Sequence, residues 1–121
     1  MVAAAADGRT VSGEILRASD CSIQVRMISM GLPHPAIPLT GAMCTSVAAQ
    51  IPGTLVQECA RPVANGEAFR VGHGSGALPV ESVVTRKSGG WFVEHSSVLR
   101  TARVLMKGQV FGPMDVPEMA G

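Results

Sequence analysis

Five consecutive residues, Gly72-His73-Gly74-Ser75-Gly76, form the densest glycine cluster of the chain. Glycines at this density let backbone N–H groups converge on a carboxylate or phosphate with no Cβ in the way. The spacing differs from that of a dinucleotide-binding loop, and the Lys-Ser/Thr pair of a Walker loop is missing. The cluster therefore predicts either an anion-binding bend or an ordinary glycine-rich turn between strands, and its residue types leave both open.

A second candidate anion site lies at the start of an apolar stretch, residues 42–51, which predicts a helix of about three turns. Thr40 suits the N-cap position, and Pro52-Gly53 ends the helix. Such a helix is apolar nearly all round, so we expect it to be buried. Free N–H groups and the positive end of the helix dipole attract an anion at its amino end.

Cys44 and His34 are the candidates for proton transfer. Cys44 falls in the first turn of the predicted helix, where the dipole could acidify a thiol, although a small buried hydrophobe is the alternative. His34 stands between two prolines ahead of the helix and is either a hydrogen-bond donor at the anion site or merely structural. The spacing of the three His and three Cys gives no support to a metal site.

Length and composition limit the classes of protein to which the chain can belong. The 121 residues suffice for one modest domain, and 16% are charged where about 25% is typical. A surface short of charge predicts a dimer or one part of a larger body. The net charge of +1 gives no electrostatic case for nucleic acid, and prolines interrupt the uncharged stretch, so no membrane span is expected. Three irregularly spaced cysteines, Cys21, Cys44 and Cys59, predict reduced thiols and a cytoplasmic location.

The elements that would position these residues are mostly strands. Alternating residues 22–30 predict a strand, and residues 54–56 begin another. Residues 77–86 and 91–99 predict an antiparallel pair joined by a turn at residues 87–90. Residues 100–106 have both strand and helix character, and Arg100, Arg103 and Lys107 are best explained as a solvated face. The prediction is an α+β unit with a curved, mostly antiparallel sheet, a partial barrel, around one buried helix. We expect residues 1–19 to be a poorly ordered or truncated edge, 20–113 the domain, and 114–121 a tail.

Several of these segments resemble the PrpF-type isomerases. The resemblance rests on Arg26-Met27-Ile28-Ser29-Met30-Gly31, His34, Thr40-Gly41-Ala42, Cys44, Ile51-Pro52-Gly53-Thr54, Gly72-His73, Ser75-Gly76 and Arg100-Thr101-Ala102-Arg103, in that order. It runs from about Asp20 to Pro113. The family includes methylaconitate and methylitaconate isomerases and oxalomesaconate tautomerase. Its members share the two-domain fold of diaminopimelate epimerase, in which each domain is a β barrel around a helix and the ligand lies between the domains at the helix amino ends.

The resemblance implies an allylic or cis-trans isomerisation of an unsaturated di- or tricarboxylic acid by proton transfer, with no cofactor. This chain would be the carboxyl-terminal domain. One carboxylate would accept from Thr40, Gly41 and Ala42, and another from the loop of His73, Gly74, Ser75 and Gly76.

Three departures, one of them from the related epimerases, limit what is carried over. The family's proton-moving lysine and cysteine belong to the amino-terminal part, so this chain would be incomplete for catalysis alone and would need the missing domain or a second copy. Pro38 stands where related epimerases have their acid/base cysteine, so Cys44 does not inherit that role. Gly74 replaces a usual proline, which predicts a looser loop.

Three hypotheses follow. The leading one is the carboxylate-binding domain of a PrpF-like isomerase. A second is an isomerase active by itself through Cys44 and His34. The alternative from another class is a non-catalytic, truncated remnant that dimerises or binds a partner. For the chain alone we expect an exposed apolar face where another domain would dock.

Overall fold

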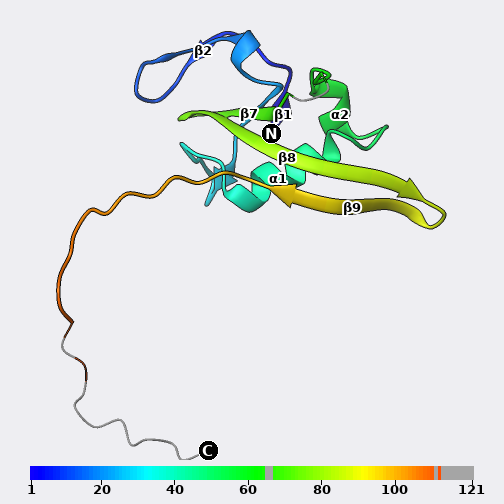
Figure 1. The fold of residues 1–121 in the computed structure, drawn as a ribbon. Helices are drawn as coiled ribbons and strands as arrows, with labels where there is room; N and C mark the ends of the chain where they lie inside the picture. The colour runs from blue at the N-terminus through cyan, green and yellow to red at the C-terminus, as the bar shows by residue number, and fades with distance from the viewer. Residues whose placement is uncertain (65–66, 111, 113–121) are drawn as a thin grey trace, which may run out of the picture.

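The computed structural model describes residues 1–64, 67–110 and 112, which form an α+β arrangement around one mixed sheet (Figure 1). The sheet has the strand order β1-β4-β7-β8-β9. Its strands are β1 (Val2–Ala3), β4 (Ile23–Val25), β7 (Phe69–His73), β8 (Gly76–Lys87) and β9 (Gly90–Ser97). Neighbouring strands are antiparallel except β4 and β7, which run parallel. The prediction of a mostly antiparallel sheet is therefore confirmed.

The first nineteen residues contain short elements tied to the sheet. Val2 of β1 pairs with Val25 of β4, and β2 (Gly8–Arg9) pairs with β3 (Ile15–Leu16). A short 3-10 helix, η1 (Ala18–Asp20), follows. The segment that we expected to be a poorly ordered edge thus contributes a strand to the main sheet.

The central helix, α1 (Leu39–Ala48), begins and ends three residues earlier than predicted. Pro38 takes the N-cap position that we expected for Thr40, because its φ of −59° and ψ of 142° suit the residue ahead of a first turn. At the other end, the Thr54 hydroxyl donates to the Ala48 carbonyl at 2.7 Å, which satisfies one of the last carbonyls of the helix.

One side of α1 packs on the sheet. Ala42 is fully buried in a core with Ile23, Val25, Val71 and Val80, whereas Cys44 on the same helix is exposed. The central helix is present as predicted, and its fully buried residues are Ala42 and Ser46. Within the described residues, the sheet covers one face of the helix only.

Residues 54–56, predicted to begin a strand, instead start helix α2 (Leu55–Cys59). The Thr54 hydroxyl accepts a hydrogen bond from the Gln57 N–H at 3.1 Å, as an N-cap does. The predicted strand at residues 22–30 is also divided, since β4 ends at Val25 and β5 (Ile28–Ser29) pairs with β6 (Leu32–Pro33).

The antiparallel pair predicted around residues 87–90 is confirmed. β8 and β9 pair from Glu81↔Ser97 to Lys87↔Gly90, with a bulge between Val83 and Val84. Residues 100–106, for which strand and helix were both open, form neither, and β9 ends at Ser97, two residues before the predicted end. Predicted features at Phe111 and residues 114–121 lie outside the described residues.

Candidate anion site at the amino end of α1

The glycine cluster lies against the chain that leads into α1. We call Gly72–Gly76 the glycine bend; it joins β7 to β8, with His73 paired to Gly76 across a two-residue turn. The Ser75 hydroxyl donates to the Pro35 carbonyl at 2.8 Å, and a Cβ added to Gly74 would lie 2.6 Å from the same oxygen. Pro35 precedes the helix by four residues. The structure therefore places the glycine bend against the segment that leads into α1.

The amino end of α1 has free donors. Pro38 provides no side-chain cap, and none of the residues that the structure describes accepts a hydrogen bond from the N–H of Leu39, Thr40 or Gly41. Ala42 differs from the expectation, because its N–H donates to the Pro38 carbonyl at 3.0 Å. The available donors are thus one residue nearer the amino end than expected.

Hydrogen bonds within the glycine bend and to two neighbouring segments fix its conformation. The Ser75 N–H donates to Nδ1 of His73 at 3.1 Å, and the Val11 N–H donates to the Gly74 carbonyl at 2.7 Å. Together with the Ser75 hydroxyl bond to Pro35, these contacts stabilise the bend internally and anchor it to other segments at two points, Pro35 and Val11. The loop is therefore not loosened by Gly74, contrary to the expectation, because Gly74 permits a backbone approach that a larger residue would block.

His73 is a neutral donor in this arrangement. Burial lowers its pKa; the Pro35 backbone acts in the opposite direction, and the positive charge of Arg26 lowers the pKa further. Since Nδ1 accepts from Ser75, the ring proton of the neutral form lies on Nε2. The hydrogen bond by which the Pro35 backbone raises the pKa involves this ring, so His73 would have to exchange Pro35 for a ligand oxygen in order to donate to a ligand.

The two proton-transfer candidates are not joined. Cys44 is the sixth residue of α1, beyond the first turn to which the dipole effect is confined, and it is exposed. The exposed His34 ring folds back on its own turn, where Nδ1 accepts from the Ala36 N–H at 3.1 Å. In the described part of the chain, no hydrogen bond links these two side chains.

Arg26 is a charged residue near the site that the residue-by-residue analysis missed. It follows β4 directly, as Gly74 follows β7, and parallel neighbours end at the same edge of a sheet. Its Nη1 donates to the Val25 carbonyl at 2.9 Å, which leaves other guanidinium N–H groups available. The sequence signal that could have revealed Arg26 is a positively charged residue directly after a short strand.

The basic residues that follow β9 lie outside this region and face solvent. Arg100, Arg103 and Lys107 are exposed, as expected of a solvated face. Over the described ranges, no helix has the length and apolar character needed to cross a bilayer.

Comparison with known proteins identifies the family. The family described as "PrpF protein" matches residues 1–113. The chain belongs to the PrpF family. It is 42% identical over 102 residues to a 2-methyl-aconitate isomerase of Shewanella oneidensis, covering 84% of this chain and 25% of that protein. It is 36% identical over 104 residues to a 3-methylitaconate isomerase of Eubacterium barkeri, covering 86% and 25%.

The fold of this PrpF chain matches a solved structure of the same family. A crystal structure of methylitaconate-delta-isomerase superposes with a TM-score of 0.74 at 34% identity, covering 89% of this chain and 27% of that one. The fold is thus diaminopimelate epimerase-like, as the resemblance implied. The chain spans about a quarter of the length of the relatives that it matches.

Proposed function

We propose that this chain is the carboxylate-binding, carboxyl-terminal part of a PrpF-type isomerase that acts on unsaturated di- or tricarboxylic acids. The observation that supports the proposal is that the amino end of α1 has N–H groups without acceptors among the described residues, and that the segment leading into it contacts the glycine bend at Pro35. Leu39, Thr40 and Gly41 would donate to one carboxylate, and Nε2 of His73 to a second. The names of the relatives, which are methylaconitate and methylitaconate isomerases, support this class of ligand.

In the proposed reaction, a proton leaves a carbon next to a carboxylate and returns at the far end of the double bond. Backbone donors at the helix end would stabilise the enolate-like charge that develops on the carboxylate. The groups that move the proton would come from the rest of a full-length protein. A cytoplasmic location is part of this proposal, since Cys21, Cys44 and Cys59 are free thiols.

The test is ligand binding to the whole chain by NMR, with cis-aconitate as the probe. We expect the amide signals of Leu39, Thr40, Gly41 and the glycine bend to shift at millimolar ligand. Signals that stay in place would overturn the proposal. Propionate, a monocarboxylate, serves as the comparison and should bind more weakly.

A single substitution can remove one donor without removing the helix. Leu39→Pro deletes an N–H at the first helical position, where proline is well tolerated, and the ψ of 142° at Pro38 is compatible with a following proline. We expect Leu39→Pro to weaken cis-aconitate binding by roughly tenfold, since a hydrogen bond to a charged group contributes about 1.5–3 kcal/mol. The matched control, Leu39→Ala, changes the side chain and keeps the N–H, and it should bind like the wild type.

The second candidate function is the non-catalytic remnant that dimerises or binds a partner. The observation that favours it is the exposure of large apolar side chains on β9, namely Trp91, Phe92 and Val93. A remnant would associate with itself or with another protein, and cis-aconitate would leave its amide signals unchanged. The same NMR titration therefore separates the two functions.

A further inference from the structure

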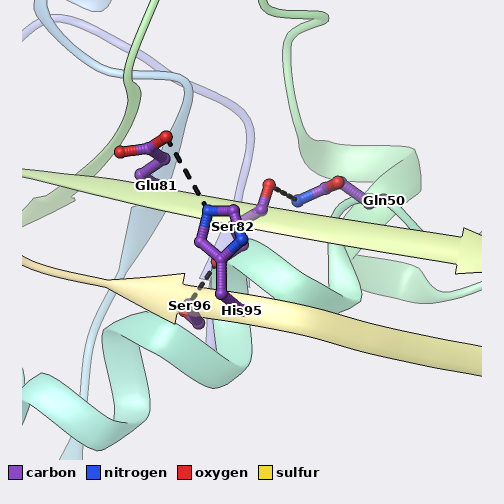
Figure 2. A network of polar contacts seen from close by, with 5 residues as sticks. All are labelled: Gln50, Glu81, Ser82, His95 and Ser96. Atoms are coloured by element: carbon purple, nitrogen blue, oxygen red, sulfur yellow. Dashed lines mark hydrogen bonds and ion pairs between the residues drawn. The ribbon is translucent and has the colours of Figure 1, made fainter.

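One edge of β8 lacks a neighbouring strand along half its length. β7 pairs with β8 only as far as Val80, and β9 pairs on the opposite edge from Glu81 onward. Within the described residues, no strand lies on the β7 side of β8 beyond Val80. There the Ser82 carbonyl accepts from Nε2 of Gln50 at 2.9 Å, and the Ser82 hydroxyl contacts that of Ser96 (Figure 2). A side chain thus covers part of an edge that would otherwise bind another strand.

A cavity of about 600 Å³ opens beside this edge. Its apolar wall includes Phe69, Val80 and Val83, and Ser46 of α1 lies at its base. The Ser46 side chain is fully buried, and its hydroxyl has no hydrogen-bond partner among the described residues. A buried hydroxyl without a partner is costly, and the cavity beside it has room for a further segment of chain. Its charged lining residues are Arg61, Glu67 and Glu81, which carry a net negative charge.

Residues 98–110, which we call the tail, have the complementary character. Figure 1 shows the tail running away from the body of the molecule. Val98 is half-buried against the core, and the large apolar side chains beyond it are between 77% and 95% exposed, namely Leu99, Val104, Leu105, Met106 and Val110. Its charged residues are all basic, namely Arg100, Arg103 and Lys107. Exposed apolar side chains at this density are typical of a segment that binds a partner.

We propose that two copies of this chain exchange tails, each tail entering the cavity of the other copy and adding a strand to the open edge of β8. The tail backbone would pair with β8, its apolar side chains would contact Phe69 and Val83, and its basic residues would lie near Glu67 and Glu81. Strand addition of this kind combines main-chain hydrogen bonds with side-chain pockets. The inference goes beyond the proposed function and does not depend on the carboxylate site.

The direction of the tail favours a second copy over the same copy. β9 is antiparallel to β8 and ends opposite Glu81, so the tail leaves it heading away from residues 82–87. To reach the open edge of its own β8, the tail would have to reverse and cross the sheet. When two copies exchange tails, each tail contacts β8 of the other copy. The same contact is therefore made twice, as two-fold symmetry requires.

The test measures the oligomeric state of the whole chain by light scattering over a range of concentrations. We expect the wild type to form a dimer. Leu105→Asp in the tail and Val83→Arg in the cavity should each weaken dimerisation by at least about tenfold. The control Val11→Asp changes a valine that is 72% exposed on a different surface, and it should remain dimeric. Glu81→Lys is a second cavity variant, should Val83→Arg fail to fold.

Mixing the two variants distinguishes exchange from other contacts. Leu105→Asp retains an intact cavity and Val83→Arg retains an intact tail, so the mixture should recover a heterodimer. The proposal is overturned by a wild type that is monomeric throughout, including one whose tail amides are protected from hydrogen exchange by docking on the same copy. It is also overturned by a dimer that survives Leu105→Asp, or by a mixture that stays monomeric.

Discussion

At the residue scale, the glycine bend depends on how closely it approaches Pro35. Gly74 is required there for space, since a Cβ would meet the Pro35 carbonyl oxygen at 2.6 Å. Gly72 has a similar role on β7, where a Cβ would lie 3.0 Å from Sγ of Cys21. Cys21 is fully buried, and burial, followed by the negative charge of Asp20, raises the pKa of its thiol. These glycines let the bend and the parallel strands come together, so small substitutions should have large effects.

Gly74→Ala should reduce the free energy of unfolding by about 1–3 kcal/mol, because the backbone oxygen of Pro35 would have to move. Urea denaturation measures the change. Gly89→Ala is the matched control, since a Cβ there has no atom within 4 Å and should cost little. Equal effects of the two substitutions would contradict this account of the bend.

His73 should make stability depend on pH. Its pKa in the folded chain lies below the ordinary value of 6.5, so just below pH 6.5 the unfolded chain binds a proton that the folded chain does not. The free energy of unfolding should therefore fall as the pH decreases from 6.5 towards the lowered pKa of the folded state, and this contribution should be constant below it. His73→Gln should flatten this part of the profile in urea titrations, whereas His34→Gln, at an exposed ring, should retain it.

At the element scale, Thr54 joins the end of α1 to the start of α2. Its hydroxyl donates to the Ala48 carbonyl at 2.7 Å and accepts from the Gln57 N–H at 3.1 Å. One side chain therefore satisfies a backbone group at each of two helix ends. This explains why a Thr-Leu-Val sequence, with its β-branched residues, forms a helical turn at this position.

Thr54→Ala should lower the free energy of unfolding by about 1–2 kcal/mol, the upper part of the range for loss of an N-cap. Chemical denaturation followed by circular dichroism measures it. Thr45→Ala is the comparison, because the Thr45 hydroxyl only donates back to the Gly41 carbonyl within α1 and alanine favours the helix. A loss at Thr45 as large as that at Thr54 would argue against the double-capping role.

At the scale of the whole molecule, the chain resembles one part of a larger enzyme. It matches about a quarter of its relatives' length. Large apolar side chains are exposed on β9 and on the tail, and the expectation that they form a face for another domain stays a prediction. A site at the amino end of α1 that binds carboxylates would still need proton-transfer groups from elsewhere.

The isolated chain should therefore bind cis-aconitate without isomerising it. Incubation with cis-aconitate in heavy water, followed by NMR of the acid, should show neither a new isomer nor deuterium exchange at carbon. Turnover that is lost in Cys44→Ala, with folding unchanged, would instead establish the chain as an isomerase by itself.

Local chemistry in the sequence determined those features that depend on neighbours along the chain. The turn at residues 87–90 joins β8 to β9 as predicted, and the apolar run produces one central helix. The ordered segments shared with PrpF-type isomerases indicated the family, because they keep both residue types and spacing.

Tertiary structure alone decided which distant groups meet. Ser75 and Pro35 are forty residues apart, and no local preference of either predicts their hydrogen bond. The parallel pairing of β4 with β7 likewise places Arg26 at the edge of the sheet where β7 enters the bend. The start of α1 depends on Pro38 and on a fold in which three amides have no acceptor among the residues that the structure describes. Local energies specify turns and helices, whereas the candidate site results from long-range packing that only the folded chain brings about.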